Sequence, residues 1–202
     1  MNTYRIKTLP GRENIRWEEI EKAEISNYGW VESKHYDSFA KLVYIKGSGF
    51  ICKMFCAERE PYAACTKDGG EVWKDSAMEF FFSFEDGKYI NLETNSTGAR
   101  VQEFSTYPRQ CLKVFDKIPE GFKVTASREG VYWTLEIELP LEKLQVFFPS
   151  VDADKLIPGY EFTGNFYKVG VTKEEHYAMW NEVKTETPDF HRPDYFGKLV
   201  IE

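Results

Sequence analysis

Residues 76–96 read SAMEFFFSFEDGKYINLETNS and contain the strongest turn signal of the chain. The pair Asp86-Gly87 readily adopts the tight turns that join neighbouring antiparallel strands. In the arm before the turn, every second residue is large and apolar. In the arm after it, apolar and polar residues alternate. A period of two residues is typical of a strand, so this stretch predicts a two-stranded hairpin.

Two further hairpins are predicted from the same pattern. One joins residues 121–127 to residues 131–140 through Arg128-Glu129-Gly130, and the other joins residues 40–46 to residues 49–58 through Gly47-Ser48-Gly49. Later strands are expected at Gly164–Val169 and Gly197–Ile201, and short helices at Trp17–Ala23 and Leu139–Val146. Many short strands with few helices indicate an all-β chain, folded as an antiparallel, immunoglobulin-like β-sandwich in one domain over residues 1–202.

Composition excludes several classes of protein. The chain has 202 residues, of which 42% are hydrophobic and 16% aromatic, which excludes a disordered chain. The net charge of −7 argues against a general binder of nucleic acid or of anionic membranes. No apolar run approaches the roughly 20 residues that span a bilayer. Residues 1–14 are polar and lack a secretory signal, so we expect a cytoplasmic protein, or a secreted one whose leader has been removed. The oligomeric state is left open.

A row of polar side chains marks the strand after Asp86-Gly87. Strand alternation places Tyr89, Asn91, Glu93 and Asn95 on one face. Asn and Glu are poor strand formers, and together they offer hydrogen-bond donors and acceptors about 7 Å apart. Glu79, on the neighbouring strand, is expected on the same sheet face near the Asn95 end. The row is either an ordinary exposed face or a surface for a neutral, hydroxyl-rich ligand.

Two of the five tryptophans stand in polar loops. Trp133 lies on the apolar side of its strand and is predicted to be core, while Trp17 and Trp30 are predicted to be packing residues. Trp73 follows a Gly-rich loop, and Trp180 begins a long polar loop. The faces of sugar rings stack on indoles while their hydroxyls need hydrogen bonds, so loop tryptophans above a polar strand face would supply both.

These features together resemble family 9 carbohydrate-binding modules and the group called family 9-like. The central segment is EVWKDSAMEFFFSFEDGKYINLETNSTGA, residues 71–99. The closing segments are WTLEIELPLEKL (133–144), GNFYKVG (164–170), MWNEV (179–183) and PDFHRPDYFGKLVIE (188–202). The order of these segments is similar to that of the family from about Trp17 to the end of the chain.

The resemblance implies a jelly-roll β-sandwich that binds sugar between two stacking aromatic side chains. By motif position these are Trp73 and Trp180, with Glu79 and Asn95 as polar partners. Members that bind xylan and cellulose carry a basic residue two positions before the strand Asn, where this chain has Glu93. This departure changes the local charge, so the resemblance alone does not imply the family's preference for reducing-end sugars.

Calcium is the one cofactor that the resemblance suggests. Members of the family often bind Ca²⁺, although none is expected to be required here. Acidic residues cluster at Asp152-Ala153-Asp154 and at Glu85-Asp86, without the spacing of an EF-hand. A calcium site is therefore allowed by the sequence but not located by it.

The leading interpretation is non-catalytic binding of a mono- or oligosaccharide, in the context of polysaccharide catabolism. A second is a glycosidase-like enzyme that uses Glu79 and Glu93 as paired carboxylates. The sequence shows neither a cleft nor a metal triad among its three histidines, which favours binding. A third is a protein-interaction module whose exposed aromatic loops form the interface.

Overall fold

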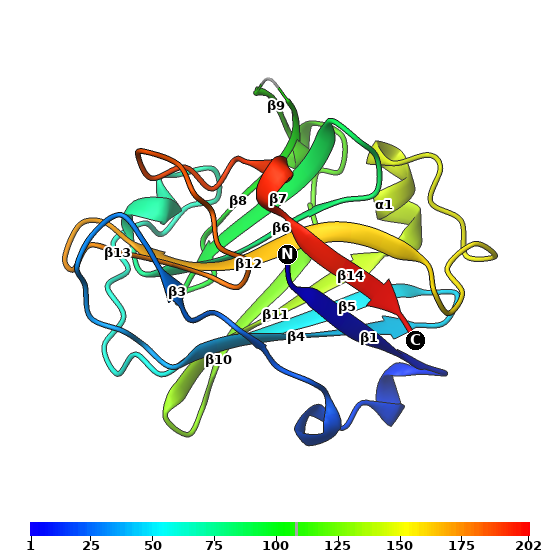
Figure 1. The fold of residues 1–202 in the computed structure, drawn as a ribbon, viewed down its shortest axis with the longest axis horizontal. Coiled ribbons are helices and arrows are strands. Elements are labelled where there is room, and N and C mark those ends of the chain that lie inside the picture. Colours follow the sequence, from blue (N-terminus) through cyan, green and yellow to red (C-terminus); the bar gives the residue numbers. More distant parts are fainter. Residues whose placement is uncertain (108) are drawn as a thin grey trace.

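The computed structural model describes residues 1–107 and 109–202. Its strands, shown in Figure 1, are β1 Thr3–Leu9, β2 Ala23–Glu24, β3 Asn27–Tyr28, β4 Ser38–Ile45, β5 Gly49–Cys56, β6 Ala77–Ser83, β7 Lys88–Asn95, β8 Arg100–Thr106, β9 Gln110–Lys113, β10 Lys123–Glu129, β11 Tyr132–Pro140, β12 Glu161–Gly170, β13 His176–Met179 and β14 Gly197–Ile201. The described residues contain one α-helix, α1 Leu141–Phe147. They also contain the 3₁₀ turns η1 Arg12–Asn14, η2 Trp17–Glu19, η3 Val72–Lys74, η4 Val114–Asp116 and η5 Pro193–Tyr195. The all-β prediction is confirmed.

All three predicted hairpins form. β6 pairs with β7, β10 with β11 and β4 with β5, each antiparallel. The β10–β11 turn lies at Gly130 and Val131, one residue later than predicted, because Glu129 already pairs with Tyr132. Gly130 has φ +61°, a backbone conformation that favours glycine.

The short elements differ more from the predictions. The helix predicted at Leu139–Val146 begins at Leu141, and the one predicted at Trp17–Ala23 is a 3₁₀ turn followed by β2. The strand predicted at Gly164–Val169 extends over Glu161–Gly170 as β12. The sequence of Thr106–Glu120 predicts an irregular loop. Residue 108 of this stretch lies outside the described residues, and β9 and η4 follow it.

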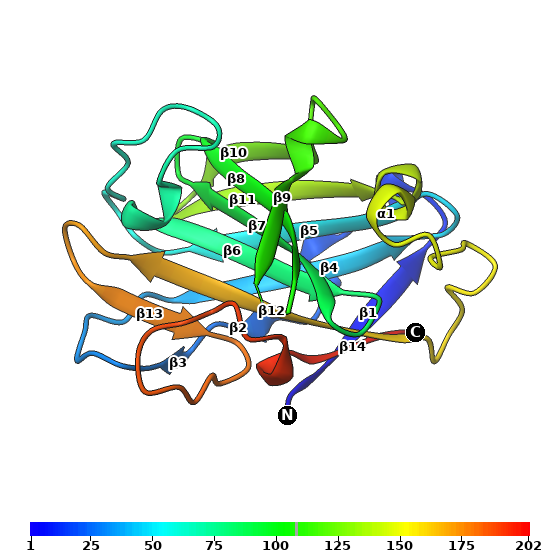
Figure 2. The ribbon, with the colours of Figure 1, turned by 90° about the horizontal axis from the view of Figure 1, so that it is seen from above.

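The strands form two layers that share one strand. One layer runs in the order β10-β11-β5-β4 and the other in the order β14-β12-β6-β7-β8-β9. Between them, β1 pairs with β14 through its first half and with β4 through its second half, both times parallel. Every other pairing between described strands is antiparallel. Figure 2 shows the two layers and β1 at their common side.

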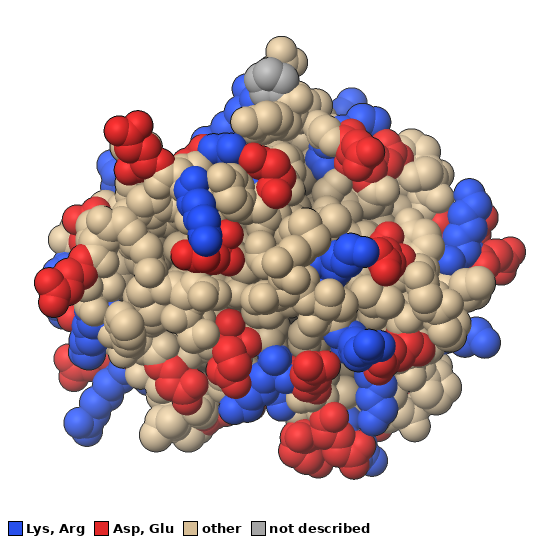
Figure 3. All heavy atoms as spheres, viewed as in Figure 1, with Lys and Arg blue, Asp and Glu red and all other residues tan. Residues whose placement is uncertain are grey.

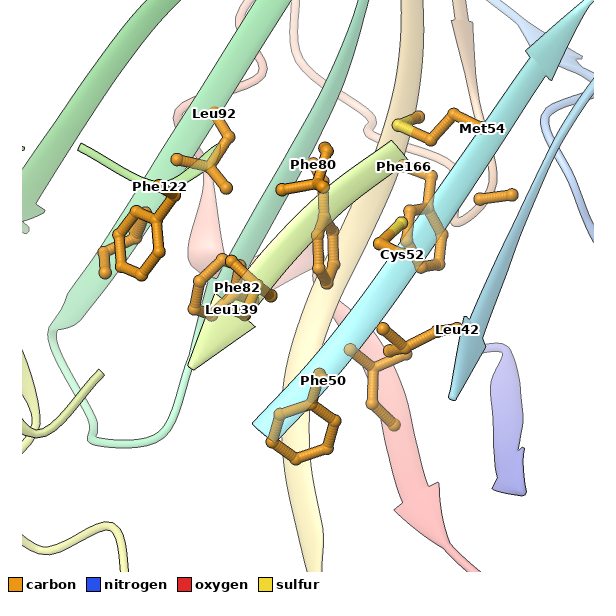
Figure 4. Packing of buried hydrophobic residues seen from close by; sticks show 14 of the residues in the cluster. Leu42, Phe50, Cys52, Met54, Phe80, Phe82, Leu92, Phe122, Leu139 and Phe166 are labelled. Carbon is orange, nitrogen blue, oxygen red and sulfur yellow. The ribbon is translucent and has the colours of Figure 1, made fainter. Parts of the chain in front are cut away.

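The main core lies between the layers. Leu42, Cys52 and Met54 from β4 and β5 face Phe80 and Phe166 from the other layer, as Figure 4 shows. Phe80 and Phe166 stack on each other with ring centroids 4.6 Å apart. These residues come from the apolar side of each alternating strand, so the hydrophobic effect fixes which face of each sheet points inward.

A second, smaller apolar cluster lies on the outer face of the β12–β6–β7 layer. Its buried members are Ala77, Phe81, Tyr89, Tyr167, Val169, Met179, Val183, Phe190 and Phe196. Several of them come from the segment that follows β13 and crosses over the sheet. The strand face that carries Tyr89 and its polar neighbours is therefore covered by a loop.

Surface charges alternate in sign on the face that carries β14. Figure 3 shows Lys and Arg side chains interspersed with Asp and Glu there. None of the helices in the described residues has the length and apolar character needed to cross a bilayer.

Candidate functional site

A pocket of about 470 Å³ opens on the outer face of the β12–β6–β7–β8 layer. Its floor carries Glu79 of β6, Glu93 of β7 and Val169 of β12. Its remaining lining residues are Gly69, Gly70, Glu71, Trp73, Val101, Glu103, Arg109, Val171, Tyr177, Pro188, Asp189, Phe190 and His191. Residues from the five strands β6, β7, β8, β12 and β13 and from the loops next to them meet here, so the pocket exists only in the folded chain.

Glu79 and Glu93 lie directly opposite each other. The β6–β7 register pairs them, and strand alternation points both side chains to the outer face. Both are almost completely buried, and Glu79 is only 3% exposed. Asn91 Nδ2 donates a hydrogen bond to Glu93 Oε1 at 2.9 Å. In the described part of the chain, the Glu79 carboxylate receives no hydrogen bond and has no cation within ion-pair distance.

The two carboxyl groups hold protons more tightly than isolated ones. Burial raises the pKa of Glu79 well above its usual value, and the neighbouring Glu93 raises it further. Burial also raises the pKa of Glu93 to about 7, against the opposing effect of the hydrogen bond from Asn91. Near neutral pH, the pair therefore retains a proton, so it offers both a donor and an acceptor.

Trp73 stands at the edge of the pocket. It lies in η3 with 40% of its surface exposed, while the preceding Val72 is fully buried and anchors the turn. Gly69 has φ +76°, and its amide donates to the Arg100 carbonyl at 2.8 Å, which ties the loop to β8. A large exposed ring held by an anchored turn is available for stacking.

Asn95 supports this loop from outside the pocket. Its Nδ2 donates to the Cys65 carbonyl and to Asp75 Oδ2, both at 2.8 Å. Its Oδ1 accepts hydrogen bonds from Thr97 and Ala99. All of its hydrogen-bonding capacity is used within the protein, and it does not line the pocket. The prediction that Asn95 contacts a ligand is therefore corrected: it positions the segment that leads to Trp73.

Trp180 lies in the core and not at the pocket. It is only 6% exposed, and its ring meets Tyr4 and Phe166 edge-on at centroid distances of 6.4 and 5.7 Å. The prediction that Trp180 is a second stacking surface is therefore wrong. Trp180 follows β13 at a position that alternates with Tyr177, so the two side chains point to opposite faces of the sheet.

Tyr177 and Phe190 form the apolar wall that Trp180 was predicted to provide. Trp30 contacts both rings at 5.6 Å and donates from its Nε1 to the Thr185 carbonyl at 2.8 Å. Trp30 thus anchors the loop that carries Phe190, in agreement with its prediction as a packing residue. Strand alternation over residues 176–180 would have placed Tyr177 on the pocket side and Trp180 on the core side. That inference requires this short segment to be assigned as a strand from the sequence.

His191 lies beside the floor in a neutral state. Its Nδ1 is 3.0 Å from the Tyr89 hydroxyl, and burial together with Arg109 lowers the pKa of His191 to about 3. Asn91, predicted to contact a ligand, is fully buried beneath the surface and instead bonds to Glu93 and Ser105. It orients Glu93 without lining the pocket.

A second pocket, of about 580 Å³, is lined by Lys74, Glu58, Ser76 and His176 among other residues. Next to it the fully buried Lys168 Nζ is 3.3 Å from Glu58, 2.8 Å from Ser76 Oγ and 2.6 Å from His176 Nε2. Ser76 also donates to Glu58. These polar groups are paired with one another, whereas Glu79 in the first pocket is not. The first pocket is therefore the better candidate for a ligand.

The acidic clusters considered for calcium do not form a coordination set. Asp152 Oδ1 accepts the Asp154 amide at 3.0 Å, and Glu85 is held by Lys88 at 2.8 Å. Over residues 1–107 and 109–202, there is no group of three or more His, Cys, Asp or Glu side chains that could hold a metal ion. A calcium site elsewhere stays a prediction.

Comparison with known proteins gives the family and the fold. The model of carbohydrate-binding family 9 matches residues 10–201. A proposed carbohydrate-binding protein of Bacteroides uniformis ATCC 8492 shares the fold with a TM-score of 0.83 at 23% identity, with 99% of each chain covered. No curated protein sequence matches the chain.

Two family 9 modules of Caldicellulosiruptor kristjanssonii have related structures. The one solved with cellotriose has a TM-score of 0.66 at 9% identity, covering 100% of this chain and 94% of that one. The one solved with glucose has a TM-score of 0.61 at 13% identity, covering 98% and 95%. At such identities the likeness concerns the fold alone, and it confirms the β-sandwich. With the family match over nearly its whole length, the chain belongs to carbohydrate-binding family 9.

Proposed function

We propose that the pocket above Glu79 and Glu93 binds a mono- or oligosaccharide, with one sugar ring stacked on Trp73. Carbohydrate-binding family 9 consists of non-catalytic modules, so the chain binds its sugar without catalysing a reaction on it. The observation that carries the proposal is the exposed Trp73 ring at the edge of a pocket whose floor holds buried carboxyl groups.

The chemistry of the pocket suits a sugar. The Trp73 and Tyr177 rings offer apolar faces to the C–H groups of a pyranose, and the proton-sharing carboxyl pair offers hydrogen-bond partners to its hydroxyls. The relatives solved with cellotriose and with glucose support a glucose-type ring. A site of this size is expected to bind with Kd values of about 10 μM to 1 mM, or about −7 to −4 kcal/mol.

The test is a titration of intrinsic tryptophan fluorescence with glucose, cellotriose and xylotriose, repeated with a calcium chelator. Trp73→Ala is expected to lower affinity at least tenfold, because it removes the stacking surface. Trp73→Phe keeps a flat ring at the same place and should retain part of the affinity.

Since Trp73 is 40% exposed, its replacement should leave the fold intact, which circular dichroism would verify. Unchanged sugar binding by the folded Trp73→Ala protein would show that the ligand does not stack there. A failure of every sugar to bind the wild-type chain would contradict the proposed function itself.

A further inference from the structure

The lining of the pocket is strongly acidic. Its charged side chains are one guanidinium and five carboxyl groups: Arg109, Glu71, Glu79, Glu93, Glu103 and Asp189. Three of the carboxylates have partners in the structure. Glu71 pairs with Lys74 at 2.8 Å, Glu103 lies 3.7 Å from Arg109, and Asp189 accepts the His191 amide at 2.9 Å.

Glu79 and Glu93 lie at the bottom of the pocket, where Glu93 accepts a hydrogen bond from Asn91 and Glu79 accepts none from the described residues. In the described part of the chain, neither has a cationic partner within ion-pair distance, and Glu79 also lacks a hydrogen-bond donor. A buried carboxylate without a cation is costly, because water is excluded and the two like charges repel. A ligand that supplied a positive charge here would remove both costs at once.

We propose that this pocket selects a sugar that carries a free amino group, with its ammonium held between the Glu79 and Glu93 carboxylates and its ring stacked on Trp73. The inference rests on the proposed function and specifies its ligand. An ammonium has three donors, which match two facing carboxylates, whereas a hydroxyl donates one hydrogen bond and brings no charge. Trp73 and the apolar wall of Tyr177 and Phe190 would contact the uncharged part of the sugar ring.

A divalent metal fits this position less well than an ammonium. Ca²⁺ requires six to eight oxygen ligands, and the floor offers two facing carboxylates. The described residues contain no cluster of three or more His, Cys, Asp or Glu side chains that could hold a metal ion, here or elsewhere. An ammonium needs only two or three acceptors, which is what the pair presents.

The pair also predicts a proton signature for binding. The charged or titratable groups that act on Glu79 and Glu93 are Glu103, Arg109, Lys168 and Tyr167, with Asp189 and the neutral His191 at the wall. At pH 6–7 the free pair retains a proton, because burial raises the pKa of both groups, and repulsion by Glu93 raises that of Glu79 further. The positive charge of a bound ammonium stabilises both carboxylates in their ionised form. Binding of the ammonium should therefore release the proton that the free pair retains. A neutral sugar should leave it in place.

The experiment compares glucosamine, glucose and N-acetylglucosamine by isothermal titration calorimetry at pH 6.5. Each is titrated in two buffers of different ionisation enthalpy, which reports the protons released. We expect at least about tenfold tighter binding of glucosamine than of either neutral sugar, with release of up to one proton per site. Glu79→Gln and Glu93→Gln should each reduce the preference to about twofold or less. Glu161→Gln, an exposed residue paired with Lys198, changes the net charge equally and should leave the preference intact.

The outcomes separate the inference from the function it rests on. If glucose binds as tightly as glucosamine without proton release, the amino-group preference is refuted and the sugar site stands. If methylamine alone binds as tightly as glucosamine, the pocket is a general amine site and the ring contributes nothing, which also refutes the inference. If none of the sugars bind, the proposed function fails together with it.

Discussion

Glu79 and Glu93 store unfavourable free energy in the folded protein near neutral pH. Their pKa values are raised in the folded state, that of Glu93 to about 7, against an ordinary value of 4.5. The folded state therefore holds more protons than the unfolded chain between these two values. By linkage, the stability that Glu93 contributes is fully present below pH about 4.5 and is lost as the pH rises to about 7, and the raised pKa of Glu79 acts in the same direction. For Glu93 alone the loss is on the order of 3 kcal/mol.

We therefore predict that Glu93→Gln is more stable than the wild-type protein at pH 8, by on the order of 1–3 kcal/mol, and that the advantage shrinks at pH 4.5. The glutamine oxygen can still accept the hydrogen bond from Asn91. Urea unfolding at a series of pH values measures this difference. A Glu93→Gln protein that is less stable than wild type at pH 8 would show that the carboxylate is stabilised by a partner.

Single residues were the hardest level to predict from sequence. Trp73 and Trp180 both stand in polar surroundings in the sequence, yet one is exposed and the other is core. The difference depends on which face of the sheet the Trp180 side chain points to, directly after the four-residue strand β13. So short a strand has no clear period in the sequence. Asn95 could not be recognised as a loop support, because its partners Cys65 and Asp75 are 20 to 30 residues away in sequence.

Strand β14 approaches the end of β13 so closely that only glycine fits at its first position. A Cβ added to Gly197 would lie 2.4 Å from the Trp180 ring. We predict that Gly197→Ala costs about 1–3 kcal/mol of stability, because the indole must shift within a packed core. Adding Trp180→Phe should recover part of this loss, since the smaller ring leaves room for the methyl group.

Denaturant unfolding of the two single variants and the double variant gives their coupling energy. Strictly additive effects would indicate that the Trp180 ring does not pack on β14, in disagreement with its core position. Gly164→Ala serves as a comparison, because there the nearest side-chain contact is Leu199 and not Trp180.

The buried Lys168 of β12 links the two layers through Glu58, just beyond the end of β5. Lys168 is fully buried, and burial lowers its pKa while Glu58 acts in the opposite direction. We predict that Lys168→Met destabilises the protein by about 3–5 kcal/mol, because it leaves the Glu58 carboxylate buried without a cation.

The double variant Lys168→Met, Glu58→Gln should recover much of that stability, since no unpaired charge remains. Thermal unfolding of the wild-type protein and of these two variants tests the idea. If the double variant is no more stable than Lys168→Met, the loss comes from packing and not from the uncompensated charge.

Elements with strong turns were predicted well, and most of the missed strands lack such turns. The three hairpins carry glycine turns and clear alternation, and all three form. In contrast, β8 alternates Val101, Glu103 and Ser105 with Gln102 and Phe104, so neither of its faces looks apolar in the sequence. The mostly polar β1 was missed for the same reason, although Tyr4 and Ile6 are buried in the core.

For the whole molecule, the β-sandwich fold and the protein family could be predicted from the sequence. The loop that follows β13 and covers the polar strand face could not. That face was expected to be exposed, whereas Tyr89, Asn91 and Glu93 are buried beneath the loop that follows β13. Loop paths depend on long-range contacts such as that of Trp30 with Phe190, which no local pattern reveals. Cellular location, calcium binding and the one-domain boundary over residues 1–202 stay predictions.

The parallel pairing of β1 with β14 has a mechanical consequence. These strands hold the two ends of the chain, in a register that sets Thr3 beside Lys198 and Ile6 beside Ile201. A pull on both termini would drag the strands lengthwise past each other, so their backbone hydrogen bonds would bear the load together and not one at a time. The pocket lies on other strands, over β6 and β7. Tension applied to the chain ends would therefore act first on the β1–β14 pairing and not on the strands that line the pocket.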